Sequence, residues 1–152
     1  MHSLRTIQKL PVTLDEAWDF FSSPSNLKEI TPPHMGFKIL SEKNDKMYPG
    51  MIISYIVKPF PGIPVKWVTE ITHVEVKKYF IDTQIHGPYS IWHHQHHFKE
   101  IEGGVEMRDI LHYRIPFGIM GRLVNKVLVG KKVKQIFDYR YKVLEERFGK
   151  FE

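Results

Sequence analysis

Two alternating segments joined by a glycine pair occupy residues 87–118 and constrain the fold more than any other part of the chain. Their sequence is GPYSIWHHQHHFKEIEGGVEMRDILHYRIPFG, in which apolar and polar side chains alternate on both sides of Gly103 and Gly104. Such alternation is typical of strands with one buried face, and paired glycines suit a tight turn because they accept positive φ. The segment therefore predicts a two-stranded antiparallel hairpin.

Residue parity along the two arms predicts which face of this hairpin is buried. The more apolar face carries Trp92, His94, His96 and Phe98 on the first arm, and Val105, Met107, Asp109, Leu111, Tyr113 and Ile115 on the second. We expect this face to point inward, with His93 and His97 on the other side. Two imidazoles and a carboxylate on an apolar face are typical of the wall of a binding cavity.

The composition predicts one folded domain over residues 1–152. Of these residues 42% are hydrophobic, which fits a globular core and not a disordered chain. No apolar run approaches the ~20 residues of a membrane span, and the N-terminus lacks the apolar core of a signal peptide. Without cysteine, no disulfide or thiolate chemistry is possible. We therefore expect a cytoplasmic protein.

The net charge of +5 is concentrated at the C-terminal end of the chain. Residues 118–152 contain nine basic and four acidic side chains, whereas residues 1–117 contain 13 of each. A basic segment is attracted to anionic partners such as nucleic acid or a membrane surface, but it is also common on a solvated helix face. We favour the solvated face and expect no nucleic-acid partner.

The order of elements predicted from the sequence is strand, two short helices, six strands and a long helix. A strand at 3–10 precedes a helix with Thr13 and Glu16 as a capping box, and Ser23-Pro24 begins a second short helix that ends near Pro32-Pro33. Strands are predicted at 37–41, 51–58, 65–75 and 79–86, with a stiff loop at 59–64, before the two hairpin arms. The apolar stripe of the helix at 119–149 changes phase at Gly130, which favours a kink or a break there; a break would leave a separate lid.

The residues that carry a family resemblance are spread along the whole chain. They include LPVTLDEAWDFFSSPSNLKEITPP, VKWVTEITHVE, GPYSIWHHQHHF, VEMRDILHYRIPFG and IFDYR. These segments and the element order resemble the SRPBCC superfamily, which includes START domains and birch-pollen-allergen-like proteins, and within it bacterial polyketide cyclase/dehydrase-like proteins. The resemblance implies an α+β helix-grip fold, in which a seven-stranded curved antiparallel sheet surrounds a long C-terminal helix.

The resemblance also implies a deep, largely apolar cavity between the sheet and this helix, closed at one end by the short helices. Ligands of the superfamily are hydrophobic molecules such as lipids, sterols and polyketides, so a hydrophobic small molecule is the expected partner. Candidate ligand-binding residues are Trp67, Thr69, Phe80, Asp82, Gln84, Trp92, His94, His96, Phe98, Met107, Asp109, Leu111, Tyr113, Met120 and Val124. Phe60, Ile63, Phe117 and Ile119 are candidates for the cavity mouth.

His94 and His96 project from one strand face, and a meander would bring Asp82 and Asp109 beside them. These groups can pair internally, hydrogen-bond a ligand, or supply an acid–base catalyst from His94, His96 and Asp109. We expect no metal or other cofactor, because a fixed third metal ligand cannot be named from the sequence.

Three functions remain open, and whether the protein is an enzyme is not decided by the sequence. The leading hypothesis is a binding or carrier domain for a hydrophobic molecule. The alternatives are a cyclase or dehydratase with a His/Asp pair, and an interaction module whose basic C-terminal helix meets an anionic surface. Motifs for nucleophilic serine chemistry, phosphate-binding loops and zinc proteases are absent from the sequence.

Overall fold

Strands β6 (Ile91–Ile101) and β7 (Gly104–Arg114) form the predicted antiparallel hairpin. They belong to a computed structural model that describes residues 1–41, 46–60 and 62–152. Because Ile101 pairs with Gly104, the turn consists of Glu102 and Gly103, one residue earlier than the glycine pair suggests. Gly103 adopts a φ of +80°, whereas Gly104 already belongs to β7.

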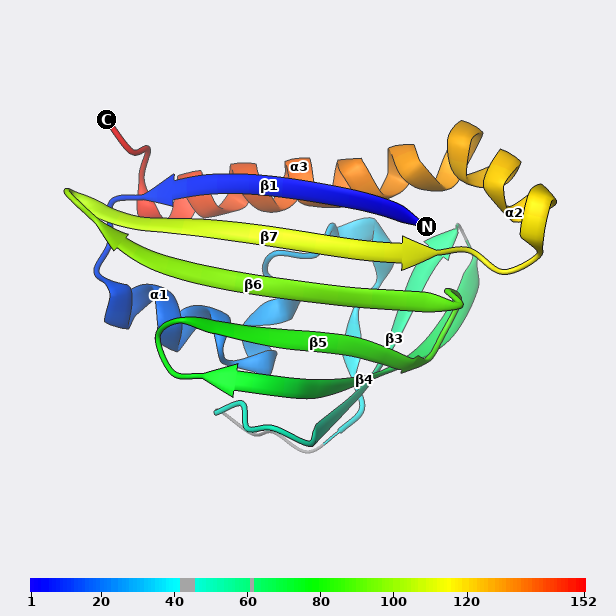
Figure 1. The fold of residues 1–152 in the computed structure, drawn as a ribbon, viewed down its shortest axis with the longest axis horizontal. Helices are drawn as coiled ribbons and strands as arrows, with labels where there is room; N and C mark the ends of the chain where they lie inside the picture. The colour runs from blue at the N-terminus through cyan, green and yellow to red at the C-terminus, as the bar shows by residue number, and fades with distance from the viewer. Residues whose placement is uncertain (42–45, 61) are drawn as a thin grey trace.

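The hairpin is part of a seven-stranded antiparallel sheet, as predicted. The remaining strands are β1 (His2–Leu10), β2 (Lys38–Ile39), β3 (Met51–Phe60), β4 (Ile63–Glu75) and β5 (Tyr79–His86). Their order in the sheet is β1-β7-β6-β5-β4-β3-β2, so the meander runs from β2 to β7 and β1 closes the other edge (Figure 1). Register shifts in the β3–β4 and β4–β5 pairs interrupt the ladder, and such irregularities bend a sheet.

Three short helical segments connect β1 to β2. In α1 (Leu14–Phe21), the Thr13 hydroxyl accepts a hydrogen bond from the Glu16 amide, and the Glu16 carboxylate accepts one from the Thr13 amide, which confirms the capping box. The second predicted helix is the 3₁₀ helix η1 (Pro24–Lys28). A further 3₁₀ turn, η2 (Pro33–Met35), begins where that helix was expected to end, since proline also suits the first helical position.

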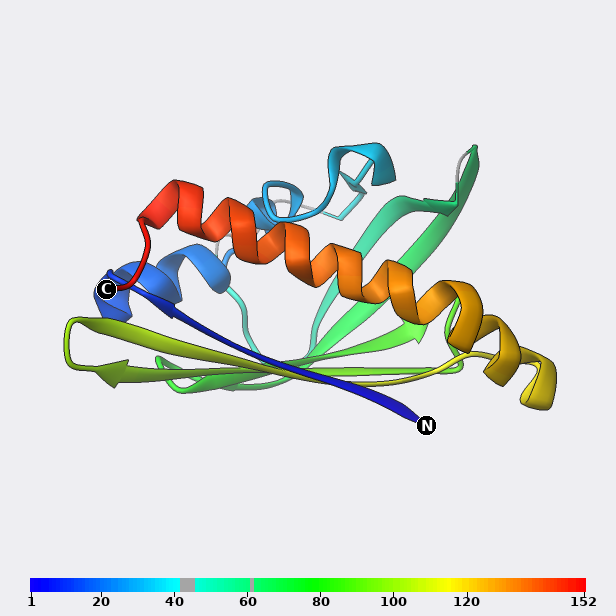
Figure 2. The same ribbon diagram turned by 90° about the horizontal axis from the view of Figure 1, so that it is seen from above.

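The C-terminal helical region consists of α2 (Gly118–Val124), the π-helical segment η3 (Asn125–Val129) and α3 (Gly130–Phe148). The change in helix geometry therefore lies immediately before Gly130, where the sequence predicts a kink or break. In Figure 2, α3 crosses one face of the sheet, and α2 extends beyond the sheet. No helix in the described part of the chain is long and apolar enough to cross a membrane.

The two ends of α3 meet different parts of the core, and the space between them is left for a cavity. Toward its C-terminal end, Leu144 packs with Trp18 of α1 and Phe98 of β6. Nearer its N-terminal end, Val133 and Phe137 pack on Leu111 of β7. The helix thereby covers the β1-β7-β6 half of the sheet.

The loop predicted at 59–64 is shorter in the structure, because β3 continues to Phe60 and β4 begins at Ile63. Pro61 and the side chain of Phe60 lie outside the described residues. Strands β3 and β4 lie toward the other edge of the sheet, where Ile136 of α3 packs against the cluster that contains Val57 and Trp67.

Candidate ligand-binding site

A cavity of about 860 Å³ is lined by residues of α1, the 3₁₀ segments, β3 to β6 and the C-terminal helices. Its wall is mostly apolar and aromatic. Ile53 and Val57 of β3, Trp67 and Ile71 of β4, and Phe137 of α3 are all buried and face it. A volume of this size is within the range of small-molecule sites, roughly 300–1,000 Å³.

Nine of the candidate ligand-binding residues lie at the wall of this cavity. They are Trp67, Thr69, Phe80, Asp82, Trp92, His94, His96, Met120 and Val124. The fold thus brings together side chains from β4, β5, β6 and α2. Their contact with a ligand remains a proposal, developed below.

Six other candidates point to the same face of the sheet but do not reach the cavity. They are Gln84, Phe98, Met107, Asp109, Leu111 and Tyr113. Phe98 and Met107 are covered by α1 and by Leu144, and Leu111 and Tyr113 by Val133 and Phe137. The reason is the position of α3, which buries the inward side chains of β7 before they reach the open space. The Gln84 side chain instead donates to the carbonyl of Tyr89 (2.6 Å) and accepts from its amide (3.2 Å).

The mouth of the cavity is formed in part by the start of the C-terminal helical region. Phe117, Met120 and Val124 line the cavity and are nevertheless exposed, which places them at its opening. Ile63 and Ile119 are exposed and do not line it.

The short helices were expected at one end of the cavity, but no lining residue of α1 or α3 was predicted from the sequence, and Ile53 and Val57 of β3 were not predicted either. Phe20 and Phe21 of α1, Ile53, Tyr55 and Val57 of β3, and Val133, Ile136, Phe137 and Arg140 of α3 all line the cavity. Strand alternation of Ile53, Tyr55 and Val57 is the signal that would have found the β3 group. For Arg140, the signal is its helical spacing of seven from Val133 and three from Phe137, which places it on the apolar face.

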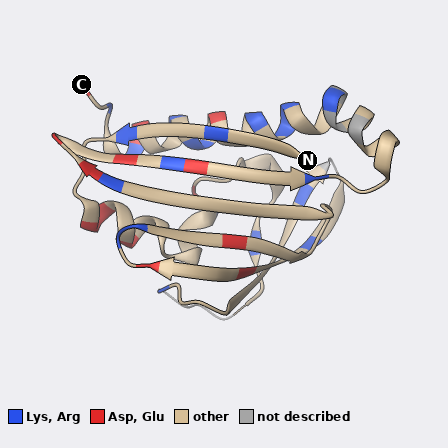
Figure 3. Ribbon diagram, in the orientation of Figure 1, with Lys and Arg blue, Asp and Glu red and all other residues tan. Residues whose placement is uncertain are grey.

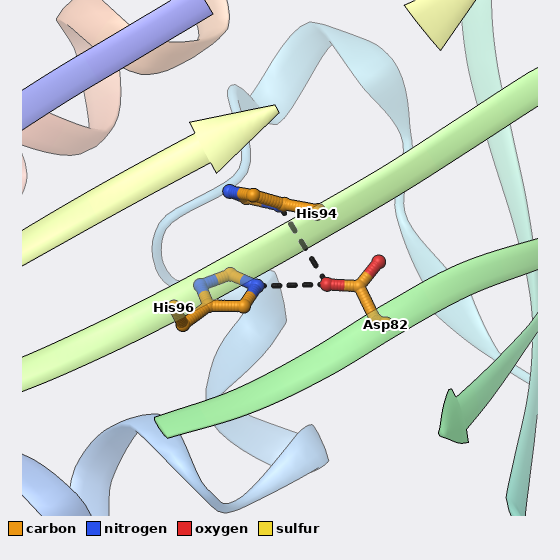
Figure 4. Close-up of side chains that lie close together, drawn as sticks. All are labelled: Asp82, His94 and His96. Atoms are coloured by element: carbon orange, nitrogen blue, oxygen red, sulfur yellow. Dashed lines mark hydrogen bonds and ion pairs between the residues drawn. The ribbon is translucent and has the colours of Figure 1, made fainter. Parts of the chain in front are cut away.

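A polar cluster lies at the wall of the cavity and consists of Asp82, His94, His96, Asp109 and Arg140, of which all but Asp109 line the cavity. In the sheet register Asp82 is opposite His94, and His96 is opposite Asp109. The hydrogen bonds run diagonally: His96 Nε2 lies 2.7 Å from Asp82 Oδ2, and His94 Nε2 lies 3.0 Å from Asp109 Oδ1 (Figure 4 shows the Asp82 side). Each carboxylate therefore reaches both imidazoles.

Asp109 is the most heavily paired member of the polar cluster. Its Oδ1 atom lies 3.0 Å from His94 Nε2, 3.0 Å from His96 Nδ1 and 3.3 Å from Arg140 Nη1, and its Oδ2 accepts a hydrogen bond from the Thr6 hydroxyl. The His96 Nδ1 contact does not have hydrogen-bond geometry. Arg140 Nη2 is buried and has no hydrogen-bond partner among the described residues, although Arg140 lines the cavity.

Aromatic rings fix the orientation of the cluster. The His96 ring stacks on Phe80 with centroids 4.2 Å apart, and the His94 ring meets Phe137 nearly edge-on at 5.5 Å. The Arg140 guanidinium lies 5.3 Å from the ring centre of Phe21. Packing of this kind limits ring rotation, so the polar atoms are held in place.

The pKa shifts in the cluster indicate one protonated and one neutral imidazole. Burial lowers the pKa of His94, and the neighbouring His96 lowers it further. Burial also disfavours the charged form of His96, but the close contacts with Asp109 and Asp82 and the negative charges of these carboxylates outweigh burial and raise the pKa of His96. Burial raises the pKa of Asp109, yet the Arg140 charge and the imidazoles hold this pKa well below its usual range.

Asp82 follows the same pattern as Asp109. Burial raises the pKa of Asp82, but the hydrogen bond from His96 and the surrounding positive charges outweigh burial and lower it. The cluster therefore contains the carboxylates Asp82 and Asp109 against the cations His96 and Arg140, and these charges cancel. Such a group can lie in an apolar core because its charges are paired.

Comparison with known proteins identifies the class. Residues 10–151 match the family model for polyketide cyclase / dehydrase and lipid transport. Because the match spans almost the whole sequence, the chain belongs to this family. A search of curated proteins gives no match to the chain.

Similar solved structures share the fold at low sequence identity. A Chromobacterium violaceum protein, CV1439, has a TM-score of 0.76 at 12% identity, over 99% of this chain and 100% of that one. A START superfamily protein from Mycobacterium smegmatis has a TM-score of 0.73 at 12% identity, over 97% of both chains. The protein TTHA0849 from Thermus thermophilus has a TM-score of 0.69 at 16% identity, also over 97% of both. At these identities the likeness establishes the START-like helix-grip fold alone.

Proposed function

We propose that this protein binds a hydrophobic small molecule of the lipid or polyketide kind in its cavity and carries it without changing it. The observation that carries this proposal is a cavity of about 860 Å³ whose wall is mostly apolar and contains one buried cluster of charged groups. A site with a large apolar surface and a few converging polar groups is typical of small-molecule binding. The family, which includes lipid-transport proteins, supports the same conclusion.

The arrangement of the wall also supports one orientation of the ligand. Its apolar body would lie against Ile53, Trp67 and Phe137, and its polar end would face the polar cluster. Arg140 Nη2 is a buried donor there that has no hydrogen-bond partner among the described residues. An oxygen atom on the ligand would satisfy this buried donor, which otherwise costs free energy.

A thermal-shift screen with a panel of lipids and polyketides tests the proposal, together with native mass spectrometry of the purified protein. A ligand present at 100 times its Kd stabilises a protein by about 2.7 kcal/mol, or roughly 5–10 °C in Tm at this size. We expect at least one panel member to give such a shift, or a hydrophobic molecule to co-purify. Neither a shift nor a co-purified molecule would contradict the proposal.

Two neighbouring residues of β3 provide a matched pair of variants for the same screen. Ile53 is buried and faces the cavity, whereas Ile52 is 47% exposed on the opposite face. Ile53→Trp fills part of the cavity and is expected to weaken ligand binding more than about tenfold, which corresponds to 1.4 kcal/mol. Ile52→Trp should leave the affinity unchanged. Equal affinities in both variants would place the ligand elsewhere.

Acid–base catalysis on the bound molecule is a second candidate, favoured by the 3.0 Å contact between His94 Nε2 and Asp109 Oδ1. Asp109 orients the imidazole, and the lowered pKa of His94 keeps it neutral and available as a base for cyclisation or dehydration. If wild-type protein converts a polyketide substrate, we expect His94→Ala to abolish turnover and His93→Ala to retain it, with both variants folded by circular dichroism. Turnover that survives His94→Ala would exclude this role.

A further inference from the structure

The two imidazoles of the polar cluster lie between two carboxylates in the same way. His94 directs Nε2 to Asp109 Oδ1 at 3.0 Å, and its Nδ1 lies 3.6 Å from Asp82 Oδ2. His96 directs Nδ1 to Asp109 Oδ1 at 3.0 Å and Nε2 to Asp82 Oδ2 at 2.7 Å. Each ring thus presents one nitrogen to Asp109 and the other to Asp82.

This arrangement matches the way in which proteins prepare histidines as metal ligands. A ligating imidazole generally donates its second ring N–H to a carboxylate, which fixes the tautomer and leaves the first nitrogen with a free lone pair. Asp109 Oδ1 lies 3.0 Å from one nitrogen of each ring, so with Asp109 as the outer partner the nitrogens left for an ion would be His94 Nδ1 and His96 Nε2. His94 Nδ1 and His96 Nε2 lie 3.6 and 2.7 Å from Asp82 Oδ2, and one ligand atom from each of the three residues lies within 4.8 Å of the other two. The three side chains converge in Figure 4.

We propose that Asp82, His94 and His96 form a binding site for a divalent transition-metal ion such as Zn²⁺, with its remaining coordination positions open to the cavity. Two imidazoles and a carboxylate suit zinc and other first-row divalent ions. Bonds of 2.0–2.2 Å to a tetrahedral ion require roughly 3.3 Å between ligand atoms. The measured separations of 2.7 and 3.6 Å from Asp82 Oδ2 lie on either side of that value.

Burial and charge decide which carboxylate is the ligand. Asp109 does not line the cavity and is already paired with Arg140 and Thr6, so it serves as the outer partner of the two rings. Asp82 lines the cavity together with His94 and His96. Binding of the ion at His96 Nε2 would release to solvent the proton that His96 carries in the metal-free cluster. Because Arg140 neutralises Asp109, a divalent ion on Asp82 with two neutral imidazoles would then leave one positive charge at the site. An anionic oxygen of a cavity ligand, or hydroxide, would complete the coordination and balance this charge.

The third metal ligand of this site follows from strand pairing in the fold and could not be named from the sequence. No metal was expected from the sequence because no third ligand was fixed, and β5 places Asp82 opposite His94 in the sheet. The other two histidines of the run, His93 and His97, lie on the opposite face and hydrogen-bond Thr83 and Gln95 instead. They offer a control on the same strand.

Zinc titration of untagged, chelator-treated protein tests the proposal by calorimetry. We expect one equivalent of Zn²⁺ per chain, with Asp82→Asn binding more than about tenfold more weakly and Asp109→Asn about 10–100-fold more weakly. The His93→Ala/His97→Ala double variant should bind as the wild type does. Absence of stoichiometric binding by the wild type would overturn the proposal. So would binding that Asp82→Asn retains and the double variant loses.

A second measurement needs no variant, so it stands even if Asp82→Asn fails to fold. In the wild type, Zn²⁺ is expected to shift the imidazole NMR signals of His94 and His96 and to leave those of His93 and His97 in place. The reverse pattern would assign the ion to the outer face. Binding of a fluorescent fatty acid by the metal-free protein reports separately on the proposed carrier function, so failure of either proposal is recognisable on its own.

Discussion

Replacing Arg140 with methionine is expected to lower the free energy of unfolding by about 3–5 kcal/mol, the usual cost of removing one partner of a buried ion pair. Arg140 and Asp109 are both 8% exposed, and Arg140 Nη1 lies 3.3 Å from Asp109 Oδ1. Without the guanidinium, the cluster retains two carboxylates against one imidazolium, and one negative charge is left in the core. Urea denaturation monitored by tryptophan fluorescence measures the loss.

Two further variants separate the charge effect from lost packing. Lys134→Met removes an ion pair on the same helix, α3, but Lys134 and Asp138 are mostly exposed, so we expect a change below about 0.5 kcal/mol. Asp109→Asn added to Arg140→Met removes the uncompensated carboxylate, and the double variant should recover part of the lost stability. If Arg140→Met destabilises no more than Lys134→Met, the cluster does not depend on this pair.

The basic, mostly exposed character of the C-terminal region was predicted from the sequence, but the burial of Arg140 was not. Lys and Arg residues recur along the C-terminal helical region (Figure 3), and most of those that the structure describes are exposed, as the basic composition indicated. Among these described residues Arg140 is buried, since it follows Val133 and Phe137 on the face toward the sheet. The net charge of a segment does not show which face of a helix a charged residue lies on, whereas the spacing of that residue from apolar residues does.

Alternation along β6 and β7 predicted the buried faces correctly, because the side-chain period of a strand is fixed by its backbone. His94 and His96 are buried, and His93 and His97 are only partly so. Alternation does not tell which inward side chain meets a helix and which meets open space. Phe98 and Leu111 were expected at the cavity and lie under α1 and α3 instead. That outcome depends on how α3 crosses the sheet, which no local pattern encodes.

The pairing within the cluster also depended on tertiary structure. The meander order placed Asp82 and Asp109 on the strands that flank β6, as expected. Each carboxylate reaches the ring opposite it in the register and also the other ring diagonally, and these contacts follow from the register and the sheet twist together. The sequence did not predict the β6–β7 register to within one residue. The turn was expected at Gly103-Gly104, whereas it lies at Glu102-Gly103.

Alanine at Gly104 is expected to destabilise the protein by about 3 kcal/mol or more, at the upper end of ordinary single substitutions. A Cβ atom at this position would lie 2.0 Å from the carbonyl oxygen of Leu10 and 3.1 Å from Cα of Pro11. Both are backbone atoms, so rotation of a side chain cannot relieve the clash. The end of β1 would have to move, and Leu10 there is fully buried in the core beside α1.

Gly103→Ala is the matched control, because the adjacent glycine is needed for a different reason. Its φ of +80° disfavours alanine, at a cost of roughly 1–2 kcal/mol, but its Cβ would meet only the Phe151 ring at an ordinary 3.7 Å. Urea denaturation should therefore rank Gly104→Ala well below Gly103→Ala in stability. Amide hydrogen exchange should show faster opening at Leu10 and in α1 for Gly104→Ala alone, because the displaced strand end leads directly into that helix. Equal losses in the two variants would mean that β1 moves away at little cost, and that turn conformation alone accounts for the glycine pair.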